Sequence, residues 1–413
     1  MKIVGIVAEY NPFHRGHAWQ IREARRLAGE EYTIIAVMSG DFVQRGEPAV
    51  YQKHARAEAA CRCGADLVVE LPLRFCLSPA EVFAEGAVRL LKALGTETLS
   101  FGSETADAER LRETAALLTE PGFPELVREE LKHCPAQGSA EAGQKTAERM
   151  LGRPIPELGR PNDILALEYL KTIRRDGMEM EILPVPRRGS GHDRKEAGAF
   201  PSAMFLREKL RNGENLSDLV PPEVEAVFRR EREAGREASD TEIRDRLMLS
   251  RLRFLDQADF AMLPDTGDGI ENRLYRAVRE EADYEAVLNA VTGKRCPRAR
   301  VRRLCMNAVL GVRAAEERNS PLYARVLSFS PEGRKWLHEN GDRTEIPLLT
   351  KPAQVRRLND AAQEEFELGA RAHDFFTLCY PKAAVCPVGE DWRTGPVFSE
   401  PESWRESETK DAE

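Results

Sequence analysis

Two histidines near the amino terminus have a spacing that suits phosphate chemistry. Residues 9 to 17 read EYNPFHRGH and follow a short apolar stretch that is typical of a strand. His14 and His17 are three positions apart, so both side chains lie on one face of the first helical turn. There they can donate N–H hydrogen bonds to phosphate oxygens, where charge builds when a carboxylate attacks the α-phosphorus of ATP. Gly16 lets a base or a ribose approach the backbone closely.

A second group of candidate residues follows the next apolar stretch, residues 32–38. It consists of side chains of both charges and an amide: Asp41, Gln44, Arg45 and Glu47. Open α/β sheets bind ligands at the carboxyl ends of their strands. We therefore predict that Asp41 and Arg45 help to hold a substrate. The alternative is an ordinary solvated loop, which also carries both signs of charge.

The elements that must position these residues alternate between strand and helix patterns. Apolar stretches predict strands over residues 2–9, 32–38, 66–71, 96–102 and 179–185. Helical patterns occupy residues 17–27, 52–63, 79–94, 162–175 and 202–210. This alternation predicts an α/β fold class, with a Rossmann-like parallel sheet. A turn from strand to helix then places backbone N–H groups and a positive helix end at the top of the sheet.

The chain divides into three parts by composition. Residues 1–215 carry the alternating pattern and are predicted to form an ATP-binding catalytic domain. Residues 216–387 form the second part and are predicted to be a helical domain. From residue 221 to about 384, apolar residues recur at the i, i+3 and i+4 spacing of helices. Residues 388–413 form a polar, acidic tail that we expect to be flexible.

A basic window within the second part indicates a nucleic-acid partner. Residues 291–313 carry seven lysines and arginines and no acidic residue, in a chain of net charge −8. Clustered basic side chains supply much of the affinity for nucleic acid. We predict contacts through Lys294, Arg295, Arg298 and Arg302, the alternative being a solvated helix paired with acidic neighbours. A second basic cluster follows the fifth strand and consists of Arg187, Arg188, Arg194 and Lys195. It could bind ATP, RNA or both; the alternative is a solvated basic loop.

Composition excludes several classes of protein. A pI of about 5.7 rules out a uniformly basic coat, although a local basic face is compatible with it. The longest apolar runs are strand-sized, so no segment is predicted to span a bilayer, and the amino terminus has no signal-peptide pattern. None of the eight cysteines forms a C-x-x-C pair, which predicts reduced thiols without a disulfide framework or a zinc site. We expect a cytoplasmic protein.

The H-x-G-H motif after the first strand is the signature of the HIGH-type nucleotidyltransferase superfamily. Four longer strings are more specific: EYNPFHRGH at 9–17, MSGDFVQRGEPA at 38–49, ADLVVELP at 65–72 and FGSE at 101–104. With them, the chain resembles the bacterial tRNA(Met) cytidine acetate ligase family. The resemblance is dense over the predicted α/β domain and looser to about residue 380.

The resemblance implies a reaction. Members of this family use ATP and acetate to make N4-acetylcytidine at the wobble position of elongator tRNA(Met), without acetyl-CoA. Adenylation would convert acetate into acetyl-AMP, which has a good leaving group. The cytosine N4 amine is a weak nucleophile, so it needs an activated carbonyl and accurate positioning, and the base must leave its stack. We predict no metal site of the protein's own, although Mg²⁺ usually accompanies a triphosphate.

The resemblance also implies positions for site residues. His14 and His17 would be catalytic; Asp41 and Arg45 are predicted to be catalytic from their place after the second strand. Ser202 to Arg207 resembles the second superfamily motif, with Met204 where threonine is usual. The implied nucleotide-binding residues are Val7, Ala8, Glu9, Tyr10, Asn11, Pro12, Phe13, His14, Arg15, Gly16, His17, Ala18, Trp19, Gln20, Gly102, Asn162, Arg188, Gly189, Ser202 and Arg207.

Two other functions remain open from the sequence. One is a small-molecule adenylyltransferase of the same superfamily, acting on a nucleotide or a pantetheine-like phosphate. Such enzymes are usually shorter and need no helical domain with a basic window. The other is a non-catalytic RNA-binding protein, against which the intact His14, Gly16 and His17 count. Replacing either histidine by alanine separates them, because only an enzyme has acyl transfer to lose.

Overall fold

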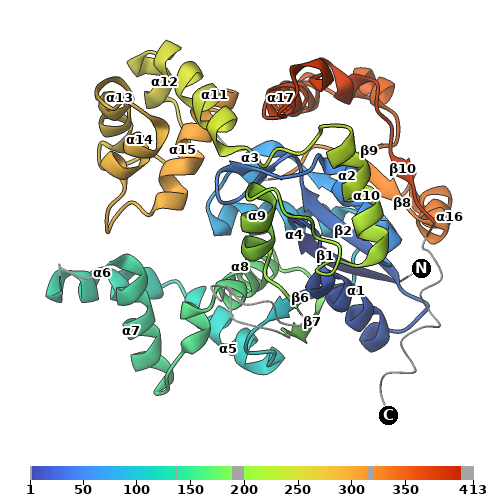
Figure 1. Cartoon of the computed structure of the whole chain (residues 1–413). Coiled ribbons are helices and arrows are strands. Elements are labelled where there is room, and N and C mark those ends of the chain that lie inside the picture. Colours follow the sequence, from blue (N-terminus) through green and yellow to red (C-terminus); the bar gives the residue numbers. More distant parts are fainter. Residues whose placement is uncertain (1, 135–137, 188–199, 315–319, 401–413) are drawn as a thin grey trace.

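The centre of the protein is an eight-stranded sheet. The computed structural model describes residues 2–134, 138–187, 200–314 and 320–400. The strand order is β10-β8-β5-β2-β1-β6-β7, and β9 pairs with β8 (Figure 1). The strands of this sheet are β1 (Ile3–Ala8), β2 (Thr33–Ser39), β5 (Leu67–Leu71), β6 (Thr98–Ser103), β7 (Glu181–Pro186), β8 (Ala324–Phe329), β9 (Leu348–Leu349) and β10 (Val397–Phe398).

The five strands from β5 to β7 are parallel, which confirms the predicted α/β fold class. All seven residues of β2 are buried, because the sheet is covered on both faces. Successive side chains alternate between two cores: Ile35 and Val37 pack on one face, and Ile34 and Ala36 on the other. The chain runs from β1 to β2 and β5 on one side and then crosses to β6 on the other. This reversal opens a crevice beside β1, where open α/β sheets bind ligands.

Helices cover both faces of the sheet and fix the position of the crevice. One face packs against α1 (Arg15–Ala28), α2 (Lys53–Arg62), α9 (Ala203–Arg211) and α10 (Pro222–Glu233). The other packs against α4 (Ala80–Ala93), α5 (Ala108–Leu118), α8 (Pro161–Arg175) and α16 (Pro331–Asn340). Helix α1 is amphipathic and buries Ala18, Ile21 and Ala24 against the sheet.

Five helices gather in a separate lobe with its own core (Figure 1). They are α11 (Thr241–Phe254), α12 (Gln257–Ala261), α13 (Ile270–Glu280), α14 (Tyr284–Val291) and α15 (Arg298–Leu310). The remaining helices are α3 (Leu73–Cys76), α6 (Phe123–His133), α7 (Ser139–Leu151) and α17 (Asp360–Thr377), with short 3₁₀ turns η1 (Pro156–Gly159), η2 (Pro352–Arg357), η3 (Ala383–Val385) and η4 (Glu390–Trp392). We call α11 to α15 the helical lobe.

The predicted boundaries of the helical second domain, residues 216 and 387, are both wrong. Val224 and Phe228 of α10 belong to the core of the α/β unit, so the chain stays with the sheet beyond residue 215. Strand β8 then returns to the sheet and pairs antiparallel with β5. The polar Arg325 and Ser328 interrupt the apolar run of β8. The sequence of this strand therefore lacks the continuous hydrophobic stretch that is typical of a buried strand.

The expectation of a flexible tail is also wrong for its first part. Val397 and Phe398 form β10 beside β8. Asp391 is 1% exposed and forms ion pairs with Lys53 and Arg325, two cations that are themselves buried. A buried carboxylate with two cationic partners holds this segment on the sheet, since leaving either charge unpaired would be costly. Residues 401–413 lie outside the described part of the chain.

Candidate active site

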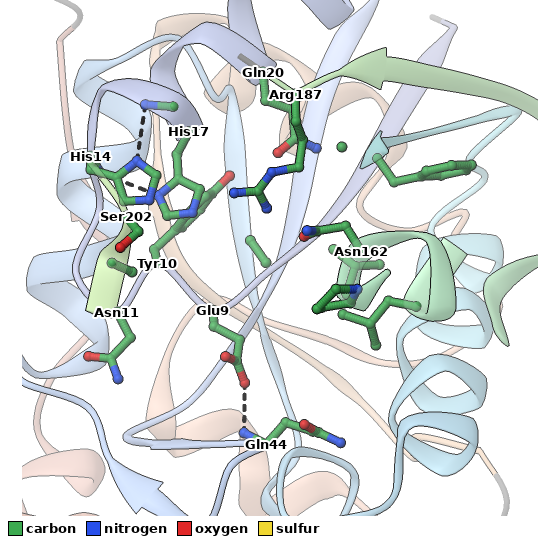
Figure 2. Close-up of a pocket in the computed structure, with 18 of the residues that line it drawn as sticks. Glu9, Tyr10, Asn11, His14, His17, Gln20, Gln44, Asn162, Arg187 and Ser202 are labelled. Carbon is green, nitrogen blue, oxygen red and sulfur yellow. Dashed lines mark hydrogen bonds between the residues drawn. The ribbon is translucent and has the colours of Figure 1, made fainter. Parts of the chain in front are cut away.

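A cavity of about 440 Å³ lies at the carboxyl ends of β1, β6 and β7. Its wall includes the loop from β1 to α1, the amino-terminal ends of α8 and α9, and the hairpin formed by β3 (Phe42–Val43) and β4 (Glu47–Pro48). The labelled side chains in Figure 2 surround this space from several elements. The sheet topology thus brings together residues from distant parts of the sequence, between Val7 and Arg207.

His14 and His17 form a reciprocal cap at the start of α1. The Gly16 N–H donates to His14 Nδ1 at 3.0 Å, and the His14 N–H donates to His17 Nδ1 at 3.3 Å. The two rings stack with centroids 3.8 Å apart. A Cβ at position 16 would lie 2.8 Å from the His14 ring, so glycine makes room for this cap. Because each Nδ1 accepts a backbone N–H, each ring carries its proton on Nε2.

The two histidines are therefore neutral hydrogen-bond donors. Burial, with the charges of Arg187 and Arg207, lowers the pKa of His14 to about 3. Burial also lowers the pKa of His17 well below its usual value, helped by His14 and Arg187. A neutral imidazole with its proton on Nε2 can donate to a phosphate oxygen, but it has no free nitrogen with which to accept a proton. The pair is suited to stabilising negative charge.

Helix α9 brings a second amino-terminal end to the cavity. Ser202 caps it by accepting the Phe205 N–H at 3.2 Å. Arg207 lies one turn further on and donates from Nη1 to the Asn11 carbonyl at 2.6 Å. This bond ties α9 to the loop that precedes His14. Two helix ends and a guanidinium at one cavity favour an anionic ligand such as a triphosphate.

Asn162 and Gly102 both line the cavity. The Asp163 carboxylate accepts the backbone N–H groups of Glu104 and Thr105 at 3.0 and 3.1 Å, which locks the end of β6 onto α8. Asn162 donates to the Glu104 carboxylate beside it. A Cβ at Gly102 would make only an ordinary contact with the Arg187 side chain, at 3.6 Å, so the space there does not by itself require glycine.

The β3–β4 hairpin connects the cavity to the helical lobe. Its Gln44 N–H donates to Glu9 Oε1 at 2.6 Å across the cavity floor (Figure 2). Gly46 has φ 76°, and a Cβ there would lie 2.5 Å from the backbone nitrogen of Arg303. Glycine thus allows the hairpin to pack directly on α15. Glu47 lines the cavity and forms an ion pair with Arg302.

Asp41 lies outside the cavity, so the expectation that it contacts a ligand is wrong. Its carboxylate is 2.8 Å from His373 Nδ1 and accepts the Lys53 N–H at 2.8 Å. Burial alone would raise the pKa of Asp41, but the charges of His373 and Lys53 and the hydrogen bond from His373 lower it well below its usual range. The sequence could not show this, since His373 is 332 positions away. Asp41 instead anchors the hairpin that carries Arg45.

Most of the other predicted residues line the cavity. They are Val7, Ala8, Glu9, Tyr10, Asn11, His14, Gly16, His17, Trp19, Gln20, Arg45, Gly102, Asn162, Ser202 and Arg207. Pro12, Phe13, Arg15 and Ala18 do not line it, because they face the core or the outside of the first turn of α1. Arg188, Gly189, Arg194 and Lys195 lie outside the described residues.

Sequence reasoning missed an aromatic part of the wall. It consists of Phe83, Phe101, Tyr169 and Phe200, which come from α4, β6, α8 and the segment before α9. Phe83 and Tyr169 have the helical spacing of ordinary core residues, so their types carried no separate signal. Phe101 was detectable in principle, because it lies next to Gly102 at the carboxyl end of a predicted strand.

The basic window is largely paired with acidic residues. Arg298 pairs with Glu285, Arg302 with Glu47, and both Arg300 and Arg303 with Asp265. Lys294 and Arg295 are exposed in the turn between α14 and α15, and no carboxylate of the described residues pairs with them. This turn is the part of the window that offers free positive charge.

Three other features bear on the class of protein. Among the described residues, no group of three or more His, Cys, Asp or Glu side chains is arranged to hold a metal ion. All eight cysteines are free thiols. No helix in the described ranges has both the length and the apolar composition that crossing a membrane requires.

Comparison with known proteins decides the family. A family model described as HIGH Nucleotidyl Transferase matches residues 1–388. A tRNA(Met) cytidine acetate ligase of Syntrophotalea carbinolica is 37% identical, with 92% of this chain and 95% of that protein covered. One of Syntrophomonas wolfei is 30% identical, over 96% of this chain and 99% of that protein. The chain belongs to the tRNA(Met) cytidine acetate ligase family of HIGH nucleotidyl transferases.

Solved structures of this ligase family have the same fold. Apo TmcAL of Thermotoga maritima superposes with a TM-score of 0.90 at 30% identity, covering 97% of this chain and all of that one. TmcAL of the same organism bound with alpha-thio ATP gives a TM-score of 0.89 at 31% identity. The family therefore includes a member that holds an ATP analogue on this fold, in agreement with the nucleotidyltransferase features of the cavity.

Proposed function

We propose that this chain activates acetate with ATP as acetyl-AMP and transfers the acetyl group to N4 of the wobble cytidine of elongator tRNA(Met). One observation carries the proposal. The neutral histidine pair at the start of α1 faces the cavity of a chain whose relatives, at 30–37% identity over nearly their full length, are named tRNA(Met) cytidine acetate ligases.

In the first step, an acetate oxygen attacks the α-phosphorus of ATP. The bond from that phosphorus to the β-phosphate oxygen breaks, and pyrophosphate leaves. The Nε2–H groups of His14 and His17 donate to the oxygens on which charge develops. Arg187 and Arg207, with the ends of α1 and α9, hold the rest of the triphosphate. Mg²⁺ would be held chiefly by the phosphates and water, since the cavity offers few carboxylates.

In the second step, the cytosine N4 attacks the acetyl carbonyl carbon. A C–N bond forms, the bond from this carbon to the AMP phosphate oxygen breaks, and AMP leaves. No covalent enzyme intermediate is needed, and no cysteine lines the cavity among the described residues. Acetyl-CoA has no role in this chemistry, because ATP supplies the activation.

The helical lobe is the proposed contact surface for the tRNA. Arg302 and Arg303 of α15 pack against the hairpin that lines the cavity, so RNA bound on this lobe would lie close to the reacting groups. Lys294 and Arg295 supply unpaired positive charge at the end of the lobe. Arg298 and Arg302 would contribute only if they exchanged their carboxylate partners for phosphate.

Acetate-dependent exchange of pyrophosphate into ATP tests the activation step. We expect exchange in the wild-type protein that requires acetate but not tRNA. His17→Ala should lower it about 10²- to 10³-fold, because a donor to the transition state is lost. Exchange that responds to a nucleotide or to a phosphopantetheine, and not to acetate, would contradict the proposal and favour a small-molecule adenylyltransferase.

A further inference from the structure

Acetyl transfer leaves a proton to be removed. When a cytosine N4 becomes part of an amide, it loses one N–H proton, and a side chain of the cavity can act as the general base that accepts it. The cavity-lining side chains with a titratable oxygen or imidazole nitrogen are Glu9, Tyr10, His14, His17, Glu47 and Tyr169. The hydrogen bonds and ion pairs of each side chain show whether it can accept a proton.

The two histidines cannot accept this proton. Nδ1 of His14 already accepts the Gly16 N–H, and Nδ1 of His17 already accepts the His14 N–H. Their Nε2 atoms carry hydrogen, so neither ring has a vacant nitrogen facing the cavity. Both can donate to the adenylate phosphate, which is the opposite role.

Glu47 and the two tyrosines are also poor acceptors. Glu47 is held in an ion pair with Arg302. Burial, with weaker contributions from nearby Cys61 and Cys63, raises the pKa of Tyr10 far above neutrality. Burial and the nearby Glu9 raise the pKa of Tyr169 in the same direction. Both phenols therefore remain protonated at any pH at which the protein works.

Glu9 has an available oxygen. Its Oε1 accepts the Gln44 N–H at 2.6 Å, while no hydrogen bond from the described residues reaches Oε2. Figure 2 shows the Glu9 carboxylate on the cavity floor, directed away from His14 and His17 and toward the hairpin. One cavity of about 440 Å³ thus has the two histidine donors in one part of its wall and the Glu9 carboxylate in another.

We infer that Glu9 is a catalytic residue that binds the exocyclic amine of the target cytosine and accepts its proton during acetyl transfer. This inference rests on the proposed function. As the N4–C bond forms, one N4 proton moves to Glu9 Oε2, AMP leaves with the electron pair of the broken C–O bond, and the proton later passes to water. Burial raises the pKa of Glu9 despite the Gln44 hydrogen bond and the charges of Arg207, Arg45 and Arg56, which makes it a stronger base than an exposed carboxylate.

The same carboxylate would select the base. A cytosine amine donates to a carboxylate, whereas uracil presents its O4 carbonyl at that position and would be repelled. Arg45 lines the cavity on the same hairpin as Gln44 and can donate to the cytosine O2 or N3. The Glu9 end of the cavity is therefore a subsite for a nucleobase with an exocyclic amine.

Glu9→Gln separates this role from a structural one. Glutamine keeps an oxygen that can accept the Gln44 N–H but cannot take a proton. We expect acetate-dependent pyrophosphate exchange, which needs no proton acceptor for N4, to fall far less than acetyl transfer does. Transfer from synthetic acetyl-AMP to tRNA should fall about 10²- to 10⁴-fold. Glu181→Gln is the matched control, since Glu181 is an exposed carboxylate on β7 of the same sheet, outside the cavity, and should leave both steps unchanged.

Three outcomes would overturn the inference. Normal transfer by Glu9→Gln would show that the carboxylate is not needed. An equal loss of exchange and transfer would assign Glu9 to the activation step, for example as a ligand of the Mg²⁺ of ATP. Wild-type protein that performs exchange but never acetylates tRNA would overturn the proposed function and this inference with it, and is recognised without any variant.

Discussion

At the scale of single residues, Asp41 and His373 form a buried, hydrogen-bonded pair outside the cavity. The His373 side chain is completely buried, with Asp41 at Nδ1 and Glu390 at Nε2, 2.8 and 3.0 Å away. Burial alone would lower its pKa, but the charge and hydrogen bond of Asp41, with Glu390 and Asp391, raise it from 6.5 to about 10. His373 is therefore a cation in the folded protein at neutral pH.

Because of this pair, we expect the folded protein to become less stable at alkaline pH. The pKa of His373 is higher in the folded than in the unfolded state, so its contribution is complete below about pH 6.5 and is lost as pH rises toward 10. We expect the free energy of unfolding to fall by a few kcal/mol over that window. His373→Gln should flatten the slope, as measured by denaturant unfolding at several pH values.

His338→Gln is the matched control for this experiment. His338 is an exposed histidine on α16, so its replacement should leave the wild-type slope intact. Parallel stability curves for wild type and His373→Gln would contradict the assignment of a charged His373.

Residue types and spacing predicted that His14, Gly16 and His17 lie at the cavity. This succeeded because residues that are close together in the sequence are also close together in the structure. They could not predict the tautomer of the histidines, which follows from two backbone hydrogen bonds. The role expected for Asp41 failed for the opposite reason. Its nearness to a strand end indicated a ligand contact, but its partner is a histidine from the other end of the chain.

At the scale of elements, the turn between α14 and α15 carries the test of the tRNA-binding surface. Lys294 and Arg295 are exposed and adjacent, and each neutralised phosphate contributes about −0.9 to the salt slope of binding on duplex nucleic acid. We expect the double replacement Lys294→Ala with Arg295→Ala to weaken tRNA binding and to reduce the salt slope by about one to two. Filter binding or fluorescence anisotropy at several salt concentrations measures both.

Arg334 and Lys335 provide a matched basic doublet on α16, away from the helical lobe in Figure 1. Replacing both by alanine removes the same charge, so tRNA binding should stay near wild type. If both double variants lose affinity equally, net charge rather than the helical lobe governs binding. Pyrophosphate exchange should be unaffected in either variant, because the cavity is untouched.

The parallel strands were predictable because buried strands are continuous apolar runs between helical patterns. Strand β8 was not, since the buried polar residues Arg325 and Ser328 interrupt its apolar run. The order of the tail also depends on long-range partners, because Asp391 is held by Lys53 and Arg325. The polar composition of the tail therefore did not indicate flexibility around Asp391, because buried cations of the sheet pair with this carboxylate.

At the scale of the whole molecule, one short hairpin links the cavity of the α/β unit to the helical lobe. The β3–β4 hairpin contributes Gln44 and Arg45 to the cavity wall and packs on α15 through Gly46. Its base is fixed by Asp41 and His373, which ties it to α17. The arrangement would place a bound tRNA and an adenylate on two sides of one short hairpin, so that recognition and chemistry share a structural element.

The most direct test is the incorporation of radiolabelled acetate into unmodified tRNA(Met), with ATP present and acetyl-CoA absent. We expect label in the tRNA that requires ATP, is recovered as N4-acetylcytidine after digestion, and is absent with His17→Ala. No label from folded, ATP-binding protein, or label that appears only when acetyl-CoA is added, would contradict the acetate ligase assignment.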